Sequence, residues 1–562
     1  MGNRKNIVLC SDGTGNTMIK GRGTNVWKLY EAVDLTAHRW RQRKDGGSAL
    51  GKEQIAFYDD GVGSEQNKIL KIVGGAFGYG LQRNIRDLYK SLCRAYQPGD
   101  DIYIFGFSRG AYTARVLAGL ILSCGIIRHD DLRGGRKLDE LSKLAYKKFR
   151  SHFRLGTVKG QLAIKAEKKV LVAVREMERA GNEASESLSR KVDAMRAIAE
   201  SANKKVEAAQ KKAVAETDAF RREYSISDDV YAPDGQVNIK FIGVWDTVAA
   251  VGLPFKGLSK LWNLYVYPFM FPDYVLSSRV QKGCHAISVD DQRGTFHPMM
   301  WDERGEDPES DHLEQVWFPG VHSNVGGGYP KQGISLIALD WMIHRAKEKG
   351  LKFIKSERDR YRHLQNAHDK LYDSRGGLAL YYRYRPRNIG KICSTFGIEP
   401  RIHVSVFERI ALGTQDYAPG NLPGYFEIAV TDPHSGAELE DSTKLKQLVS
   451  NLDEETAAKN VDFWIRLRRL IYFALVAVTL VIVAGAGWYH GTHAKTATWV
   501  PDKMDKALQW IADLLPFGKE LYGYLLRPFL IYWGFALTAV ALLVLFWATS
   551  KFAQSKLQST FA

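Results

Sequence analysis

The chain has 562 residues, and 45% of them are hydrophobic, which is enough to build a large core. Charged residues make up 25% and aromatic residues 11%, so the composition excludes wholesale disorder. The formal charge is +17, which indicates either a solvated basic surface or attraction to a polyanion. Because no nucleic-acid-binding signature is present, we favour a membrane surface over nucleic acid as the partner.

The first 136 residues alternate between predicted strands and predicted helices. Short apolar stretches typical of buried strands lie at 6–10, 54–58 and 101–107. Helical patterns lie at 24–33, 81–97 and 111–123. This alternation is typical of βαβ units, so it predicts an α/β fold with a mostly parallel sheet and helices on both faces.

The pattern changes to heptad spacing over residues 137–223. Small and apolar residues recur at alternating spacings of three and four on both sides of Gly181. This spacing predicts an inserted antiparallel coiled-coil hairpin with its tip near Gly181. Residues 137–222 contain 21 Lys and Arg against 12 Asp and Glu, a net charge of +9. The hairpin is either a self-contained coiled coil or a basic arm that covers the active site or contacts lipid.

Strand patterns return at 237–245 and 315–321, and a helical pattern follows at 336–347. The segment 351–460 has a mixed pattern that assigns no elements. We therefore expect five regions, which are a first part of the core (1–136), the inserted hairpin (137–223), a second part of the core (224–345), an extension (346–460) and a membrane hairpin (461–562).

Two apolar runs near the C-terminus, at about 470–488 and 529–548, are long enough to cross a bilayer and have uncharged interiors. They predict a multi-pass membrane protein with two spans. Basic residues flank both runs on their outer sides, which predicts that the N- and C-termini are cytoplasmic. No signal peptide is expected. The five cysteines are scattered and lack C-x-x-C spacing, which argues against disulfides and a zinc site.

Residues 106–110 match the pattern G-x-S-x-G, with Ser108 at its centre. The match lies between a predicted strand and a predicted helix, the setting of the nucleophile elbow in α/β hydrolases. The helix N-terminus beside Ser108 would stabilise a developing oxyanion, and the main-chain N–H of Arg109 is the expected first donor.

A serine nucleophile needs a base, and the base needs an acid that orients it. In this fold the chain order is Ser, acid, His. Asp246 and His322 follow the predicted strands 237–245 and 315–321, so both lie where strands end and ligands bind. Rival residues are His285, His297, His312, Asp290 and Asp291. Such a triad requires no metal and no cofactor.

The loop 11–17 leaves three interpretations open. It is a hydrogen-bonded turn, or Gly13 and Thr14 offer the second oxyanion N–H, or Asp12 binds a hard cation together with Asp59 and Asp60.

Seven strings together resemble a known α/β-hydrolase domain family that includes the phospholipase effectors of bacterial type VI secretion. They are SDGTGNT (11–17), TNVWKLY (24–30), YDDGVG (58–63), GFSRGAYTAR (106–115), GVWDTV (243–248), HAISVDDQR (285–293) and EQVWFPGVHSNVGGGY (314–329). The resemblance implies a triad of Ser108, Asp246 and His322 that acts on phospholipid acyl esters. Members often carry Asp where Asn324 stands. The candidate residues that support the triad are Asp12, Asp59, Asp60, His285 and Asn324.

These observations lead to one favoured function and two alternatives. We expect acyl-ester hydrolysis through an acyl-enzyme, with membrane lipid as substrate and a coiled-coil or secretion-system protein as a partner. The alternatives are a hydrolase of small soluble esters and a non-catalytic interaction module tethered to the membrane.

Overall fold

The computed structural model describes most of the chain up to residue 435. The described residues are 4–13, 23–35, 53–60, 76–128, 137–150, 186–226, 239–248, 274–307, 309–375, 384–415 and 419–435, with single positions within 166–174 and 541–552 and at 382, 417 and 440. The chain divides into two compact units. The first comprises Met1–Ser374, Pro386–Thr414 and Asn421–Val449, and the second Arg375–Arg385, Gln415–Gly420 and Ser450–Ala562.

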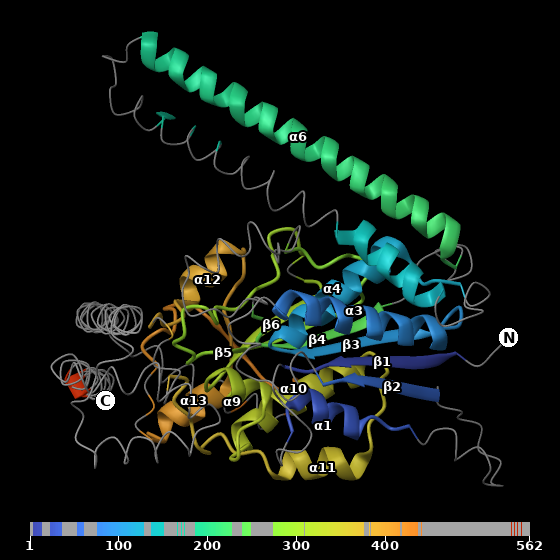
Figure 1. Ribbon diagram of the computed structural model, residues 1–562. Coiled ribbons are helices and arrows are strands. Elements are labelled where there is room, and N and C mark those ends of the chain that lie inside the picture. The colour runs from blue at the N-terminus through green and yellow to red at the C-terminus, as the bar shows by residue number, and fades with distance from the viewer. Residues whose placement is uncertain are drawn as a thin grey trace, which may run out of the picture. The chain divides into compact units, whose positions relative to one another are not determined.

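The first unit contains one sheet of eight parallel strands (Figure 1). The strands are β1 (Lys5–Ser11), β2 (Glu53–Asp59), β3 (Asp101–Phe107), β4 (Ile239–Trp245), β5 (Gly283–Ser288), β6 (Leu313–Phe318), β7 (Arg401–His403) and β8 (Glu427–Ala429). Their order is β2-β1-β3-β4-β5-β6-β7-β8, and each neighbouring pair is parallel. All eight carboxyl ends therefore lie along the same edge, where ligands bind in open α/β sheets.

Helices cover both faces of this sheet (Figure 1). They are α1 (Asn25–Ala32), α3 (Ala76–Ala95), α4 (Arg109–Cys124), α6 (Glu186–Tyr224), α9 (His322–Gly326), α10 (Gly333–Glu348), α11 (Lys355–His363), α12 (Ile389–Thr395) and α13 (Val404–Ala411), and residues 137–150 are also helical. One core contains α3, α4, the 137–150 helix and the base of α6, and the other contains α1 and α10.

Alternating side chains along the strands supply these two cores. In β1, Ile7 and Leu9 belong to the α3–α4 side, whereas Val8 and Cys10 belong to the α1–α10 side. Because successive side chains of a strand point to opposite faces, a strand covered on both sides reads as a continuous apolar run. The central strands therefore have continuous apolar sequences, and these sequences predict buried strands.

The predicted α/β fold with a parallel sheet is confirmed. Each predicted strand is present, with ends displaced by at most three residues. The sequence prediction missed β5, β7 and β8, of which β7 and β8 have three residues each. Residues 322–326, directly after the predicted strand 315–321, form the short helix α9.

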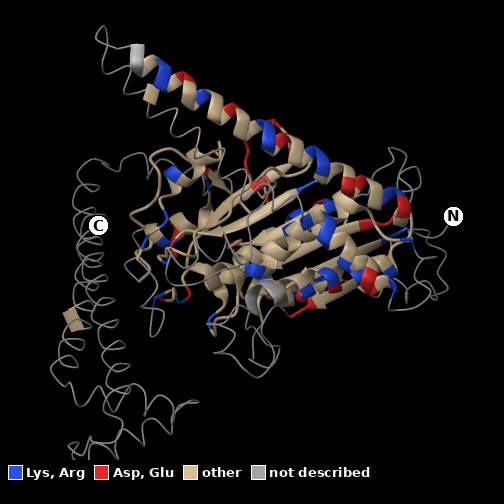
Figure 2. Ribbon diagram, turned by 45° about the horizontal axis from the view of Figure 1, so that its top comes forward, with Lys and Arg blue, Asp and Glu red and all other residues tan. Residues whose placement is uncertain are grey.

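The inserted segment contributes the 39-residue helix α6. Its buried and half-buried positions include 192, 195, 199, 202, 206, 209 and 213, the heptad stripe that the sequence predicts. The predicted tip near Gly181 lies outside the described residues. Lys and Arg alternate with Asp and Glu along α6 (Figure 2), so this half of the predicted hairpin is not uniformly basic.

Over the residues that the structure describes, none of the helices combines the length and the hydropathy that a bilayer span requires. The predicted span at 470–488 lies outside the described residues. Of the second predicted span, 529–548, four single positions are described, and all four are helical.

Candidate active site

Ser108 lies in the tight turn between β3 and α4. Its backbone has φ 59° and ψ −118°, which an L-residue adopts only under strain. A β-carbon on Gly110 would overlap the main-chain carbonyl oxygens of Ser11 and Asp12. The glycine therefore lets the elbow pack directly against the end of β1, and this fixes Ser108 at the carboxyl edge of the sheet.

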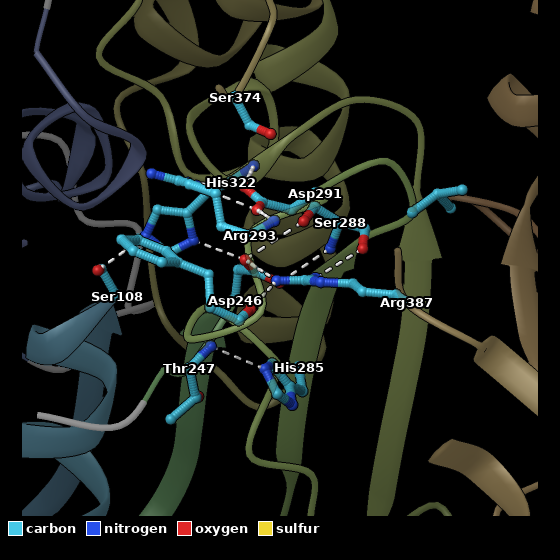
Figure 3. A network of polar contacts seen from close by, with 12 residues as sticks. Ser108, Asp246, Thr247, His285, Ser288, Asp291, Arg293, His322, Ser374 and Arg387 are labelled. Atoms are coloured by element: carbon cyan, nitrogen blue, oxygen red, sulfur yellow. Dashed lines mark hydrogen bonds and ion pairs between the residues drawn. The ribbon is translucent and has the colours of Figure 1, made fainter. Parts of the chain in front are cut away.

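Two further strand ends bring the other predicted triad residues to Ser108 (Figure 3). Nε2 of His322 lies 2.8 Å from Oγ of Ser108, and Nδ1 lies 2.6 Å from Oδ2 of Asp246. These are hydrogen-bond distances. Three residues that are 76 to 214 positions apart in the chain therefore form one continuous relay. Their catalytic roles remain predictions.

Hydrogen bonds from three residues hold Asp246 in place. It directly follows β4, has φ 39° and is fully buried. Its carboxylate accepts hydrogen bonds from the main-chain N–H and the hydroxyl of Ser288, at 3.0 and 3.3 Å. Nη1 and Nη2 of Arg387 donate to its two oxygens at 2.6 and 2.9 Å. A carboxylate with this many donors stays charged and oriented.

These contacts and the burial of the site shift the pKa values of Asp246 and His322. Burial by itself raises the pKa of Asp246, but the Arg387 charge and the hydrogen bond from His322 outweigh burial and hold that pKa well below its usual range. Burial lowers the pKa of His322, against the opposing effect of Asp246. The histidine is therefore neutral at neutral pH, the form that accepts a proton from serine.

Aromatic and acidic side chains surround the imidazole. The His322 ring packs against Phe107 and Phe296, with ring centroids 4.7 and 5.1 Å apart. The main-chain N–H of His322 donates to Asp291 at 3.2 Å, and Asp291 forms an ion pair with Arg293 at 2.6 Å. These contacts fix the ring plane and the start of α9.

The loop after β1 forms a buried cluster around Asp12. Its carboxylate accepts from the Gly13 N–H and the Thr24 hydroxyl, both at 2.5 Å, and from the Tyr58 hydroxyl at 2.6 Å. Burial raises the pKa of Asp12 despite these donors. The Gly13 N–H is thus engaged by Asp12, so a role as oxyanion donor requires this hydrogen bond to break. Thr14 lies outside the described residues.

The predicted cation interpretation finds no support in this cluster, because hydrogen-bond donors occupy both Asp12 oxygens. Asp59 accepts from the Ser11 hydroxyl at 3.4 Å, and burial, with a contribution from Asp60, raises its pKa to about 7. Among the described residues, no group of three or more His, Cys, Asp or Glu is arranged to hold a metal ion.

The remaining predicted residues lie around the triad without joining it. His285 accepts the Thr247 N–H at Nε2 at 3.1 Å, and burial lowers its pKa to about 3. Asn324 donates to the Lys370 carbonyl oxygen at 3.2 Å. Arg109 is the first residue of α4 and directly follows Ser108.

The sequence did not predict that Arg387 pairs with Asp246. Arg387 lies in the segment 351–460, whose mixed pattern predicts neither an element nor a role. Arginines alternate at positions 383, 385 and 387, and nothing in this spacing marks out Arg387, which is buried. Of the rival acids, Asp290 accepts the Gly320 N–H at 2.6 Å, and Asp291 accepts the main-chain N–H of His322 at 3.2 Å, whereas Asp246 accepts from the imidazole itself.

Comparison with known proteins gives three findings. The family model described as type VI secretion system, phospholipase effector Tle1-like, catalytic domain, matches residues 5–345. The uncharacterized protein YEL023C of Saccharomyces cerevisiae is 33% identical over 155 residues, which are 25% of this chain and 20% of that protein. The match therefore spans about a fifth of the relative's length. A crystal structure of an uncharacterized protein from Pseudomonas aeruginosa is similar over 80% of this chain and 62% of that chain, with 16% identity and a TM-score of 0.32.

Proposed function

Because the chain belongs to the family of Tle1-like phospholipase effector catalytic domains, we propose that it is a membrane-anchored serine hydrolase that cleaves phospholipid acyl esters. The observation that carries this proposal is the relay from Ser108 Oγ through His322 to Asp246, with distances of 2.8 and 2.6 Å. The strained backbone at Ser108 supports it, because such strain concentrates at functional sites.

In the proposed reaction, Ser108 attacks the ester carbonyl while Nε2 of His322 takes the hydroxyl proton. The imidazolium that forms is stabilised by Asp246 and then protonates the departing alcohol. Water, activated by the same imidazole, hydrolyses the acyl-enzyme and releases the fatty acid. Since α4 begins at Arg109, directly after Ser108, the helix N-terminus and the Arg109 N–H are the proposed donors to the developing oxyanion.

The proposed membrane anchor is the hairpin formed by the apolar runs at 470–488 and 529–548, with both termini in the cytoplasm. Exposed apolar side chains at the helical positions Val544 (58% exposed) and Leu545 (50% exposed) support this proposal. Side chains of this kind are stable in lipid and costly in water. Extraction of membranes with alkaline carbonate tests it, since an integral protein stays in the pellet. Recovery of the full chain in the supernatant would contradict the anchor.

A fluorophosphonate probe tests the serine mechanism. Full-length protein in detergent should be labelled, and S108A should not be. If the wild type is not labelled, the alternative of a non-catalytic membrane-tethered interaction module is favoured, with the coiled-coil hairpin as its binding part.

The substrate class is tested with the same two proteins. Wild type should release fatty acid from phosphatidylcholine and phosphatidylglycerol vesicles faster than it hydrolyses short p-nitrophenyl esters at equal acyl concentration, and S108A should do neither. Hydrolysis of the short esters alone would favour the small-ester alternative and refute the phospholipid assignment.

A further inference from the structure

Arg387 is a buried cation placed directly behind the predicted catalytic acid. Its side chain is fully buried and lies on the opposite side of Asp246 from His322 (Figure 3). Both terminal nitrogens face the carboxylate, so the guanidinium and the carboxylate meet in a two-pronged pairing. Arginine is suited to this geometry because its donors are fixed in one plane.

Nη1 and Nη2 of Arg387 also donate to main-chain oxygens around the site, whereas the buried Nε has no hydrogen-bond partner among the described residues. Nη1 also donates to the Ser288 carbonyl oxygen at 2.6 Å, and Nη2 to the Phe296 carbonyl oxygen at 2.5 Å. Ser288 itself donates to Asp246, and Phe296 packs edge-on against the His322 ring. The Arg387 guanidinium therefore orients the Asp246 carboxylate. It also binds the backbone of Ser288, which contacts Asp246, and of Phe296, which contacts His322.

Arg387 belongs to a segment that follows the residues matched by the family model. The family model ends at residue 345, whereas Arg387 lies 42 residues further along the chain. Asn421 fastens the segment by donating its amide to the carbonyl oxygens of Val289 and Arg387, both at 2.9 Å. The matched residues 5–345 therefore include the predicted acid but not Arg387, which contacts it.

We propose that Arg387 is a positioning residue that completes the triad, and that it sets the pH range over which His322 acts as a base. This proposal rests on the proposed function, since it assigns a role at the same site. Its physical basis is the charge balance of the Asp246–His322 pair, which lies between Arg387 and the Asp291–Arg293 ion pair at the main chain of His322. The active form has a charged Asp246 and a neutral His322, and a nearby fixed cation stabilises that form.

Protonation converts this pair from a net charge of −1 to a net charge of zero, whichever of the two residues holds the proton. The nearby cation therefore favours the unprotonated pair and lowers the apparent pKa at which activity is lost in acid. The sign of this effect does not depend on where the proton resides. A neutral residue at 387 should move the acidic limb of the activity profile to higher pH.

The experiment measures the rate of fluorophosphonate labelling of the full-length protein in detergent from pH 4 to 9. The wild type, with S108A as the blank, first establishes that labelling depends on Ser108. Without such labelling the proposed function itself fails, and the role of Arg387 as a positioning residue fails with it. With labelling established, the variants R387Q and R387K test the new inference alone.

R387Q removes the charge and keeps an amide donor. We expect its acidic limb to lie about one to three pH units above that of the wild type. R387K keeps the charge and loses the two-pronged pairing, so the limb should stay in place while labelling at pH 8 slows about tenfold or more.

R409Q is the matched control. Arg409 is also a fully buried arginine of the C-terminal segment, but its Nη1 donates to the main-chain oxygens of Ala367 and Asp369 and its hydrogen bonds to these lie away from the triad. R409Q should leave the acidic limb unchanged even if it lowers stability. A purely structural role for Arg387 predicts slower labelling at every pH and no movement of the limb in R387Q.

Three results would overturn the inference. The first is an acidic limb of the R387Q labelling profile at the same pH as that of the wild type. The second is an R409Q acidic limb that moves as far as that of R387Q. The third is an R387K acidic limb that moves to higher pH. If circular dichroism shows that R387Q is unfolded, R387K decides the matter alone. Wild-type labelling rates in R387K would then contradict a positioning role.

Discussion

Replacement of Asp246 by Asn tests how far the acid controls the site. The carboxylate accepts five hydrogen bonds, two from Ser288, two from Arg387 and one from His322. Asn has one acceptor oxygen and one amide donor, so D246N loses the charge and points N–H groups at a neighbour that is itself a donor. The imidazole then loses the acceptor that fixes its orientation and its tautomer.

The structure allows both consequences of D246N to be estimated. Loss of tautomer control in a serine triad lowers kcat by about 10⁴, which corresponds to about 5.4 kcal/mol of transition-state stabilisation. The Arg387 charge is also left buried without its partner, and breaking a buried ion pair from one side costs about 3–5 kcal/mol of folding stability. D246N should therefore be both inactive and less stable.

The assay for activity is the release of fatty acid from phospholipid vesicles, and the assay for stability is urea denaturation in detergent. D291N is the matched control, because Asp291 is equally buried and is also paired with an arginine. Its hydrogen bond to His322, however, is to the main-chain N–H and not to the imidazole. We expect D291N to keep activity within about tenfold of the wild type, since the imidazole retains its acid. Activity of D246N above one tenth of the wild-type value would refute the assigned role.

A double variant separates the two effects. In D246N/R387M no uncompensated charge remains, so part of the lost unfolding free energy should return, while activity should stay at the D246N level. Recovery of activity together with stability would mean that D246N fails through misfolding and not through loss of the acid.

Three further predictions concern the surroundings of the triad. G110A should abolish labelling of Ser108 because its methyl group would overlap the end of β1, whereas G305A, with open space around it, should behave as the wild type in the same assay. Burial lowers the pKa of His403 to about 3 from 6.5, so the unfolded chain binds a proton over this range and the native chain does not. Stability should thus fall from pH 6.5 towards 3, and H403Q should reduce that slope by about 1.4 kcal/mol per pH unit in urea denaturation. N421A removes two hydrogen bonds, and we expect about 1–3 kcal/mol lower stability together with slower labelling, because Arg387 loses its support. Unchanged labelling in N421A would show that Arg387 is held without it.

Local patterns predicted much of the fold. Strands covered on both faces read as apolar runs, and the long helices have distinct caps or periodicity, so β1, β3 and α4 were identifiable. The short strands β7 and β8 were not, because three residues make no period. Such strands form only when the rest of the sheet offers an edge to pair with.

By itself, the sequence determined the elbow at Ser108, the chain order of serine, acid and histidine, and the placement of Asp246 and His322 after strands, because each of these is a local pattern. Only the tertiary structure decided which acid contacts the imidazole and that a distant arginine neutralises it. The physical reason is that the charge balance of a buried site depends on distances between segments, and residues 246 and 387 are 141 positions apart. No spacing rule along the chain records such a pairing.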